Sequence, residues 1–493
     1  MTAPTSASAK PIDYRSLLSQ TARNRMPSAI RSLYPAELIP DMISLLSGKP
    51  NAETFPFHRI LLELKPRGPD GIIETIPIEG ADLDVALQYG PTAGIPKLVD
   101  WVEEFQSRLH HRPRVTKAAP GVHGEAWRCS FGTGSQDLLT KTFEALTDPG
   151  DSVIVESPAY SGILPSLVSL KARIFEAHTD AEGVDPIYLE QLLSDWASAE
   201  ATRTSPFPKF IYTAPTGANP SGTTASEGRK RAVLSVARKH GLIILEDDPY
   251  YFLSFPGLGE DPVTRTRSKS YFALEQEEED QWGKGRVLRF DSFSKILSAG
   301  LRLGFCTGPT ELVDAIDADT SIRNLQPSGA SQGIALALLS RWGIDGFLRH
   351  ADSVAHFYKA RLDQFEAKAR HHLCASPSVA EWVTPSAGMF LWIKLKLPPT
   401  RPSDSGDGDV DEGDTLDLIG QKAKAAGVLA LPGVAFMPPP SATGAGLASG
   451  TKRTSPYVRT SFSIVPMERV DAAFERLRTV VVQAWQEAGL EMI

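Results

Sequence analysis

A lysine and an arginine follow one apolar stretch of the chain at short spacing. Residues 286–290 read Arg-Val-Leu-Arg-Phe, and the chain continues with Asp291-Ser292-Phe293-Ser294-Lys295 and then Gly300-Leu301-Arg302. A lysine at the end of a buried strand, flanked by apolar residues, can have a lowered pKa, so that its amine forms a Schiff base with a carbonyl group. Arg302 would add a second cation for an anionic group such as a phosphate. A single lysine is usually solvent-exposed, so this segment needs support from other parts of the chain.

The same segment also fits a serine-based chemistry. Ser292-Phe293-Ser294-Lys295 matches the Ser-x-x-Lys motif of β-lactamases and penicillin-binding enzymes, in which the serine is the nucleophile. Those enzymes also carry Ser-Asp-Asn and Lys-Thr-Gly, and neither tripeptide occurs in the 493 residues. The serine-nucleophile hypothesis is therefore set aside.

Four other segments place polar side chains after apolar stretches. Gly132–Asp137 (Gly-Thr-Gly-Ser-Gln-Asp) precedes a helical pattern, and glycines at a helix N-terminus let backbone N–H groups bind a phosphate. Asp247 follows a second apolar stretch, where a carboxylate can pair with a heteroaromatic nitrogen. Asn219 and Tyr160 follow two more, and a tyrosine can stack on a planar ring. Taken singly, each of these features is equally an ordinary turn, helix cap or packing residue.

Four short stretches are apolar at nearly every position, and helical patterns lie between most of them. They are residues 152–155, 209–212, 242–245 and 286–290, with helical patterns at 138–146 and 227–240. Strands of this kind are covered on both faces, which is typical of a parallel sheet flanked by helices. The fold class is therefore predicted to be α/β, with ligands bound beyond the carboxyl ends of the strands. The five polar segments would then lie along one edge of the sheet.

The chain has 493 residues, which is enough for two or three domains. We expect an N-terminal arm over residues 1–42, a large domain over 43–340 and a smaller C-terminal domain over 341–493 that ends in a helix near 467–487. A strand and a turn are predicted at 43–51. The segments 256–283 and 398–414 are predicted to be surface insertions that form solvated loops or are disordered, because one ends in a Gln/Glu/Asp run and the other is rich in Pro, Ser, Gly and Asp.

The composition argues against several classes of protein. The formal net charge of −8 argues against nucleic-acid binding through bulk charge. The three cysteines (Cys129, Cys306 and Cys374) form no Cys-x-x-Cys pair, so neither a zinc site nor a disulfide framework is expected. No stretch approaches the ~20 apolar residues of a membrane span, and residues 1–10 contain no apolar targeting core. We therefore expect a cytoplasmic protein with no metal, no nucleic-acid partner and no membrane association.

The five polar segments together match the needs of one cofactor, pyridoxal 5′-phosphate. They offer a phosphate site, an aromatic face, an amide, a carboxylate and a lysine. This cofactor has a phosphate, a planar ring, a phenolate oxygen, a pyridine nitrogen and an aldehyde. The chain resembles the fold-type I pyridoxal-phosphate aminotransferases of class I/II, from about Ile43 to about Met467. The resemblance implies a large domain with a mostly parallel sheet flanked by helices, and a smaller α/β C-terminal domain.

Five motifs carry this resemblance. The most specific is Asp291–Lys295 with Gly300–Arg302, and the others are Ser44–Asn51 with Phe55-Pro56-Phe57, Gln88–Pro96, Pro385–Trp392 and Arg459–Ser463. They are most similar to the branch of kynurenine/α-aminoadipate aminotransferases and fungal aromatic-amino-acid aminotransferases. One departure concerns the Asn-Pro-x-Gly loop of the family, because Asn219–Gly222 is intact here but follows Gly217-Ala218.

The resemblance implies a role for each matching residue. Lys295 would form the Schiff base with the cofactor and then move the proton of the substrate Cα, while Asp247 would contact the pyridine nitrogen. The phenolate oxygen would be bound by Asn219 and Tyr250, and the ring would stack on Tyr160. The phosphate would be bound by Ser135, Gln136, Ser292, Ser294 and Arg302, together with Tyr89 of the partner subunit. The substrate would meet Arg459, which binds its α-carboxylate, and also Asn219, Gly48, Asn51 and Arg31.

The implied reaction moves the amino group of an aromatic L-amino acid (Phe, Tyr or Trp) to a 2-oxo acid by a ping-pong mechanism, in a homodimer with shared active sites. Two alternatives stay open on the same residues. One is kynurenine or 2-aminoadipate as the substrate, and the other is a different pyridoxal-phosphate reaction such as C–S lysis or decarboxylation. A transcription regulator with an aminotransferase-like domain would need a winged-helix domain, for which residues 1–42 are too few. The presence of Lys295 argues against a catalytically inactive binding protein.

Overall fold

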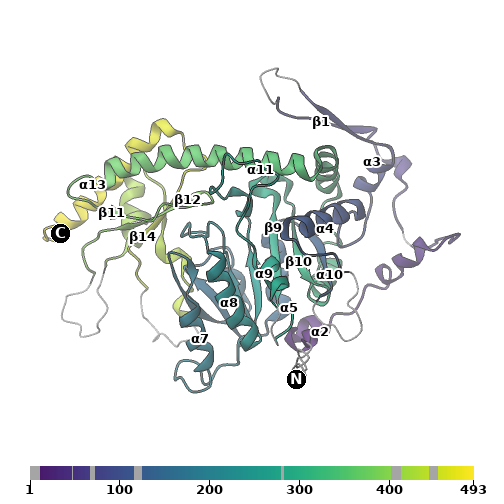
Figure 1. Ribbon diagram of the computed structural model, residues 1–493, viewed down its shortest axis with the longest axis horizontal. Coiled ribbons are helices and arrows are strands. Elements are labelled where there is room, and N and C mark those ends of the chain that lie inside the picture. Colours follow the sequence, from purple (N-terminus) through teal and green to yellow (C-terminus); the bar gives the residue numbers. More distant parts are fainter. Residues whose placement is uncertain are drawn as a thin grey trace, which may run out of the picture. The chain divides into compact units, whose positions relative to one another are not determined.

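The computed structural model describes residues 12–46, 48–66, 73–115, 125–278, 282–400, 412–442 and 453–492. The chain forms two compact units, each built from several segments. The first unit comprises Met1–Pro149, Ala237–Pro249 and Lys269–His350, and the second comprises Gly150–Val236, Tyr250–Ser268 and Ala351–Ile493. Each unit combines strands with helices, which confirms the predicted α/β class (Figure 1). The predicted domain boundaries at 42/43 and 340/341 stay predictions.

The first unit contains four hydrogen-bonded strands in the order β3-β10-β9-β8. They are β3 (Trp127–Gly132), β10 (Gly304–Pro309), β9 (Val287–Ser292) and β8 (Ile243–Asp247). β8 and β9 are parallel, and β10 is antiparallel to both of its neighbours. β8 and β10 are buried at every position, and β9 is buried at every position except Ser292. These strands therefore lie under helices on both faces, as their apolar sequences predict.

Helices of the first unit surround these strands (Figure 1). They are α4 (Pro96–His110), α5 (Ser135–Leu146), α9 (Tyr271–Glu277) and α10 (Thr310–Arg323). α5 packs on β9 and β10, α10 packs on β3 and β10, and α9 packs on β8 and β9. The buried positions of α5 include Leu138, Leu139, Phe143 and Leu146, whose spacing puts them on one face of a helix. This spacing is the pattern from which the helix at 138–146 was predicted.

Buried contacts anchor the N-terminal part of the first unit. It contains α1 (Tyr14–Leu17), α2 (Gln20–Arg23), η1 (Arg31–Leu38) and η2 (Ala52–Thr54). The buried Tyr14 donates its hydroxyl hydrogen to Gly285 O at 2.8 Å. Arg25 forms an ion pair with Asp319, and both side chains are almost fully shielded from solvent. The segment from Tyr14 to Arg25 is therefore part of the packed unit.

The strand predicted at 43–51 is wrong. The described residues of this stretch have no strand, and the side chains of Ile43 and Leu45 are 86% and 97% exposed. These two apolar side chains therefore do not pack in the core of this unit. The chain instead forms a hairpin of β1 (Arg59–Glu63) and antiparallel β2 (Thr75–Glu79), which leads into α3 (Gly80–Leu87).

The second unit contains two sets of paired strands. The first set has the order β7-β4-β5-β6, in which β7 (Phe210–Thr213), β4 (Ser152–Ser157) and β5 (Arg173–Asp180) are parallel and β6 (Gly183–Val184) is antiparallel to β5. Helices α6 (Leu164–Ser169) and α7 (Pro186–Ser194) accompany it. Helices α8 (Glu227–His240) and α11 (Gly329–Leu373) each contribute residues to both units, and α11 is kinked at Gly343. All four apolar stretches of the sequence are thus strands: β4, β7, β8 and β9.

The second set is an antiparallel sheet in the order β11-β12-β14-β13. Its strands are β11 (Ala380–Glu381), β12 (Phe390–Leu395), β14 (Tyr457–Ser461) and β13 (Leu431–Pro432). A hydrophobic core that includes Leu391 and Val458 of this sheet also contains Phe365 of α11 and Phe474 of α13 (Val470–Glu487). The predicted C-terminal helix is confirmed, with the short turn η9 (Met467–Arg469) before it. Short helical elements complete this part of the chain: η3 (Tyr251–Leu253), α12 (Thr415–Asp417), η6 (Leu418–Ala423), η7 (Gly433–Phe436) and η8 (Pro440–Ala442).

The segment 256–283 is not simply a solvated loop, as the sequence predicted. Its residues 271–277 form α9, in which Tyr271, Phe272 and Leu274 are buried. The carboxylate of Glu246 accepts hydrogen bonds from the backbone N–H groups of Tyr271 and Phe272 at 2.9 and 3.2 Å, which holds the first turn. The acidic residues of this segment suggested exposure to solvent. One of them, Glu275, is instead buried and forms an ion pair with Arg112 at 3.1 Å. Residues 279–281, and residues 401–411 of the other predicted insertion, lie outside the described part of the chain.

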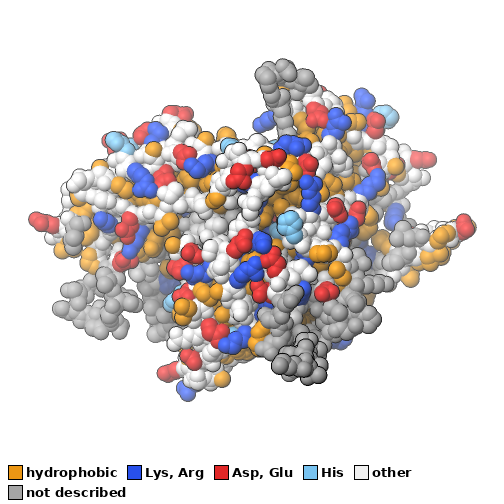
Figure 2. Space-filling view, in the orientation of Figure 1, with side chains coloured by type: hydrophobic (Ala, Val, Ile, Leu, Met, Phe, Trp, Pro, Cys, Tyr) orange, Lys and Arg blue, Asp and Glu red, His pale blue; other side chains and the backbone are white. Residues whose placement is uncertain are grey.

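Two general properties bear on partners. Within the described ranges, no helix is long and apolar enough to cross a membrane. On the face shown in Figure 2, basic and acidic side chains are interspersed among apolar ones. The expected absence of a nucleic-acid partner stays a prediction.

Candidate active site

Lys295 lies in a short turn at the carboxyl end of β9. The turn η4 (Phe293–Lys295) begins directly after the strand, and the Oγ of Ser292 accepts a hydrogen bond from the backbone N–H of Ser294 at 3.1 Å. Phe293 is 2% exposed, and its ring packs against those of Phe305 and Phe347. The packing of Phe293 holds the turn in place. The half-buried Lys295 therefore lies just after the carboxyl end of β9, as the sequence predicts.

Arg302 connects the lysine turn with the glycine-rich segment. Its backbone is left-handed (φ 48°), and its guanidinium donates to Ser294 Oγ at 3.4 Å and to Thr133 O at 3.2 Å. A Cβ atom on Gly134 would lie only 2.5 Å from Nη2 of Arg302, so the guanidinium rests directly on this glycine. A cation, a hydroxyl and a glycine loop from distant parts of the sequence therefore meet within the first unit.

The N-terminus of α5 completes this arrangement. Gly134 precedes the helix with φ 84°, and Ser135 and Gln136 are its first two residues. The β10 strand lies close to this point, because a Cβ atom on Gly304 would be 2.7 Å from Ser135 N and 2.8 Å from Asp291 O. The first N–H groups of a helix have no partner within the helix and attract anions. Helix N-terminus, Arg302 and Ser294 form a cradle that fits a phosphate, which is the group that the sequence assigns to it.

Asp247 ends the strand next to β9. It is 4% exposed, and in the parallel register of β8 and β9 it lies opposite Phe290, two residues before Ser292. The carboxylate of Asp247 and the amine of Lys295 are therefore carried by the same ends of two adjacent strands. This is the arrangement that the sequence predicts for a ring nitrogen and an aldehyde of one bound group.

A buried charge cluster lies beneath these strand ends and was not predicted. Arg289 is fully buried and pairs with Asp291 at 2.8 Å, Asp248 at 2.9 Å and Glu246 at 3.2 Å. Burial by itself would lower the pKa of Arg289, but the three carboxylates outweigh it and raise that pKa. Because side chains alternate along a strand, Glu246 and Asp248 point to the opposite face from Asp247. The only signal in the sequence was an arginine and an aspartate at alternate positions of an apolar strand.

The second unit holds the other predicted residues. Arg459 lies on β14, and its Nη1 donates to Asn219 Oδ1 at 2.8 Å. Its guanidinium also lies over the rings of Phe390 and Phe436, at 4.3 and 5.1 Å from their centroids. Burial lowers the pKa of Arg459, although Tyr250 and Tyr160 act in the opposite direction. A largely desolvated guanidinium held by an amide and two rings is a strong site for a carboxylate.

The departure in the Asn219 loop has a steric explanation. Gly217 has φ 53°, and a Cβ atom there would lie 2.8 Å from the carbonyl carbon of Ala387. Gly388 has φ 84°, and a Cβ atom on it would lie 3.0 Å from Gly217 O. Two glycines therefore allow the Asn219 loop to touch the segment before β12. This contact explains why the chain has glycine immediately before Ala218.

Tyr160 and Tyr250 complete the second group. The ring of Tyr160 lies over Gly162, since a Cβ atom there would be 2.5 Å from the tyrosine hydroxyl. Tyr250 is 5% exposed and packs edge-on against Phe390 at 6.0 Å. Phe390 belongs to a motif recognised in the sequence, whereas Phe436 gave no signal because it lies in the short turn η7 between Gly433 and Met437.

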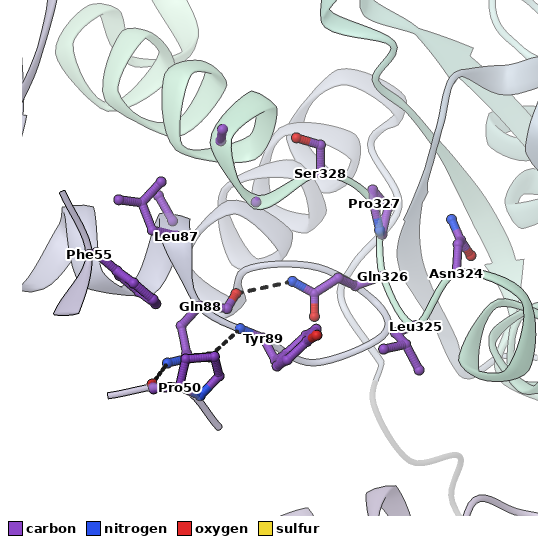
Figure 3. Close-up of a pocket in the computed structure, with 13 residues that line it drawn as sticks. Pro50, Phe55, Leu87, Gln88, Tyr89, Asn324, Leu325, Gln326, Pro327 and Ser328 are labelled. Atoms are coloured by element: carbon purple, nitrogen blue, oxygen red, sulfur yellow. Dashed lines mark hydrogen bonds between the residues drawn. The ribbon is translucent and has the colours of Figure 1, made fainter. Parts of the chain in front are cut away.

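Four predicted residues lie at the outer part of the first unit. Tyr89 is 50% exposed, and Arg31 donates to Thr92 Oγ1 at 2.8 Å. Asn51 accepts from Glu53 N and caps η2, and a side chain at Gly48 would meet open space. Tyr89 borders two hollows, of about 450 and 470 Å³. The first is lined by Arg31, Tyr34, Glu37, Lys49, Tyr89, Gly90, Pro91 and Thr92. The second appears in Figure 3.

Comparison with known families and proteins gives consistent matches. Residues 81–446 match the model of the family described as aminotransferase class I and II. The aminotransferase tdiD of Emericella nidulans is 40% identical over 467 residues, which is 94% of this chain and 95% of that protein. The mitochondrial kynurenine/α-aminoadipate aminotransferase of Bos taurus is 34% identical over 96% of this chain and 100% of that protein. The L-tyrosine:2-oxoglutarate aminotransferase atrD of Tapinella panuoides is 30% identical over 83% of this chain and 79% of that protein.

Solved structures give the same result. The aromatic aminotransferase Aro9 from Candida albicans superposes with a TM-score of 0.78 and 26% identity, covering 98% of this chain and 100% of that one. The kynurenine aminotransferase of Pyrococcus horikoshii, solved in complex with PMP, superposes with a TM-score of 0.65 and 25% identity, covering 96% of this chain and 98% of that one. The likeness thus extends over nearly the whole chain in sequence and in structure.

Proposed function

Because the chain belongs to the class I and II aminotransferase family, we propose that it transfers the amino group of an aromatic L-amino acid to a 2-oxo acid. Membership confirms the predicted enzyme class and pyridoxal 5′-phosphate as the cofactor. The proposal rests on Arg459, whose partly buried guanidinium lies over the rings of two phenylalanines and donates a hydrogen bond to Asn219. An α-carboxylate would be bound by the guanidinium, and an aromatic side chain would find aromatic neighbours.

The residues of the first unit fit the cofactor. Arg302, Ser292, Ser294, Ser135 and Gln136 would hold its phosphate. Lys295 would hold its aldehyde carbon, and the buried carboxylate of Asp247 would keep a proton on its ring nitrogen. When bound, the cofactor supplies an electron sink for the carbanion that forms at the substrate Cα.

The remaining residues bind and orient. Asn219 and Tyr250 would donate hydrogen bonds to the phenolate oxygen, and Tyr160 would cover one face of the ring. Lys295, once released, would take the proton from Cα and deliver it again, which is general acid–base work by one amine. The amino acid and the oxo acid both carry a carboxylate for Arg459, so they would use one site in turn, as a ping-pong mechanism requires.

The assembly proposed is a homodimer with shared active sites. Tyr89 of the partner subunit would reach the phosphate, and Arg31, Asn51 and Gly48 would lie on the substrate side. The exposed apolar side chains of Ile43 and Leu45 support an arm that packs on a second copy. A cytoplasmic location is proposed, supported by three cysteines that are all free, as suits a reducing compartment.

A second candidate is kynurenine or 2-aminoadipate as the amino donor. It is supported by the bovine relative and by the cations Arg31 and Lys49 that line the smaller hollow. Arg31 would suit a distal carboxylate, whereas Lys49 is already paired with Glu37 at 3.0 Å. The same hollow contains Tyr34 and Tyr89, which would also suit an aromatic ring, so the substrate has to be measured.

A substrate panel and one variant test the proposal. We expect the purified holoenzyme to transaminate phenylalanine, tyrosine and tryptophan with 2-oxoglutarate or an aromatic oxo acid as acceptor. Lys295→Ala should lose both the absorbance of the covalently bound cofactor and all turnover. Retained turnover in Lys295→Ala would contradict the central role of this lysine. A kcat/KM for 2-aminoadipate above that for every aromatic donor would favour the second candidate.

A further inference from the structure

Tyr89 lies in a loop whose backbone is held by glutamine side chains. The loop follows α3, and the backbone N–H of Tyr89 donates to Gln88 Oε1 at 2.9 Å. The next N–H, that of Gly90, donates to Gln326 Oε1 at 2.5 Å. Gln326 Nε2 in turn donates to Gln88 O at 3.3 Å. One glutamine side chain therefore binds the peptide groups on both sides of Tyr89. Figure 3 shows its hydrogen bond to Gln88.

Gln326 comes from a distant segment that is itself strongly constrained. It lies between α10 and α11, and the preceding Leu325 has a left-handed backbone (φ 65°). This conformation is costly for leucine, and such outliers persist where the surroundings determine them. After Gln326, the N-terminus of α11 is pressed against α3, because a Cβ atom on Gly333 would be 2.7 Å from Ala86 Cβ. The strained turn therefore places Gln326 at a fixed distance from the end of α3.

A second glutamine fixes the far end of the same loop. Gln332 is 1% exposed, its Oε1 accepts from Ile95 N at 2.7 Å, and its Nε2 donates to Pro327 O at 2.9 Å. Gln332 therefore ties the 89–95 loop and the Gln326 turn to one another from the side of the core. Gln326 does the same from the exposed side, next to Tyr89.

The surroundings of Tyr89 explain why its backbone needs such support. Its side chain is half-exposed and borders both hollows, so few contacts within the first unit hold the ring itself. Gly90, which follows it, has no side chain to restrict the peptide. On its other side Gly90 O accepts from Arg31 at 3.3 Å, a contact from the exposed arm. The backbone that carries the Tyr89 ring is thus held by the two hydrogen bonds of Gln326 together with those of Gln88 and Arg31.

We propose that Gln326 is the positioning residue for Tyr89, and that it sets the direction in which Tyr89 reaches the cofactor phosphate of the partner subunit. The proposal rests on the function proposed above, in which Tyr89 contacts that phosphate across the dimer. Gln326 itself touches neither cofactor nor substrate. It acts through the peptide groups of Gln88 and Gly90, so that removal of its hydrogen bonds should weaken phosphate binding only while Tyr89 has its hydroxyl.

A double-mutant cycle on the holoenzyme tests this dependence. The variants are Gln326→Met, which keeps the length of the side chain and removes its hydrogen bonds, Tyr89→Phe, which removes the hydroxyl, and the combination. The readout is the rate at which cofactor leaves the holoenzyme, followed by absorbance after removal of free cofactor. We expect Gln326→Met to speed release by about three- to tenfold, the range for one or two partly exposed hydrogen bonds. In the Tyr89→Phe background the same change should alter release less than about twofold, because coupled residues are not additive.

Gln421→Met is the matched control. Gln421 is an exposed glutamine of η6, and its side chain donates a hydrogen bond to Asp417 at 3.3 Å. The Gln421→Met variant should release cofactor at the same rate as the parent protein. Where Tyr89→Phe itself speeds release, an equal effect of Gln326→Met in both backgrounds, or no effect in either, would overturn the proposal. If Tyr89→Phe alone left release unchanged, the role of Tyr89 would be wrong, and hydrogen exchange would decide on Gln326. Faster exchange of the Gly90 amide in Gln326→Met would then uphold the positioning of the loop, and unchanged exchange would refute it.

Discussion

Gly304→Ala should open the phosphate cradle while leaving in place every side chain that would bind the cofactor. The new Cβ atom would lie 2.7 Å from Ser135 N, 2.8 Å from Asp291 O and 3.0 Å from Gly134 C, whereas ordinary contacts begin at 3.4 Å. All three neighbours are backbone atoms, so no change of rotamer relieves the overlap. The first turn of α5 and the end of β9 must move apart from β10 by about 0.4–0.7 Å, the difference between these distances and an ordinary contact.

The cost follows from two opposing effects. Overpacking of this kind typically costs about 1–3 kcal/mol, and the loss of glycine entropy in the unfolded chain returns about 0.4–1 kcal/mol. The free energy of unfolding should therefore fall by at most about 2.6 kcal/mol. Cofactor retention should be affected more strongly, because the shift separates the helix N-terminus from Arg302. Cofactor release from the holoenzyme should become at least about tenfold faster.

A nearby glycine provides the control for this experiment. A Cβ atom on Gly300 would meet only Ser298 Oγ, at 3.8 Å, so Gly300→Ala should keep parental stability and cofactor release. Urea denaturation and absorbance of bound cofactor give the two readouts. If Gly304→Ala released cofactor no faster than Gly300→Ala, the close approach of β10 to α5 would not determine the phosphate site, and the reasoning would be refuted.

Three further predictions address charge and burial. Arg289→Met should destabilise the protein by at least about 3 kcal/mol in urea denaturation, since it leaves buried carboxylates unpaired. The exposed pair Arg341–Glu74 is the control, and Arg341→Met should cost less than about 1 kcal/mol; equal effects would contradict the importance of burial. Arg459→Lys should lower kcat/KM for amino acids by about ten- to a hundredfold, because lysine keeps the charge but lacks the planar fork and the stacking on Phe390 and Phe436. Parental kcat/KM in that variant would argue against carboxylate binding by Arg459. Burial raises the pKa of the Cys306 thiol to about 12 and raises that of Cys129 as well, so neither forms much thiolate at pH 8. A thiol reagent should therefore modify the exposed Cys374 alone in the native protein and all three cysteines in urea, and rapid native modification of a second thiol would contradict this.

The sequence predicted the strands and the polar residues at their ends for a physical reason. Four stretches were apolar at nearly every position because they are buried on both faces, and their boundaries coincide with β4, β7, β8 and β9 within a few residues. The cradle was predictable in part, because glycines before a helix and an arginine after a lysine are local patterns. Its closure was not, because it depends on Gly304, which approaches Ser135 across 169 residues of chain.

Features set by distant partners were missed or misjudged. The helix α9 was predicted as a solvated loop because its sequence ends in acidic residues, and Glu246 and Arg112, far away in the chain, help to make its burial possible. The stretch 43–51 was predicted to be a strand from its apolar residues, yet Ile43 and Leu45 are exposed in this unit. Arg289 was overlooked because an arginine in a buried strand is interpretable only when its three carboxylates are seen together.

The anchored N-terminal segment also has a consequence for the order of events during synthesis. The carbonyl of Gly285 that accepts the hydrogen bond of Tyr14 is made 271 residues after the tyrosine. At about 5–20 residues per second, the tyrosine waits roughly 15–50 s for this partner. Asp319, the partner of Arg25, follows later still. The segment from Tyr14 to Arg25 therefore completes its contacts only after these distant residues have been made, although Ser19 and Gln20 can bind Glu144 and Asp148 earlier.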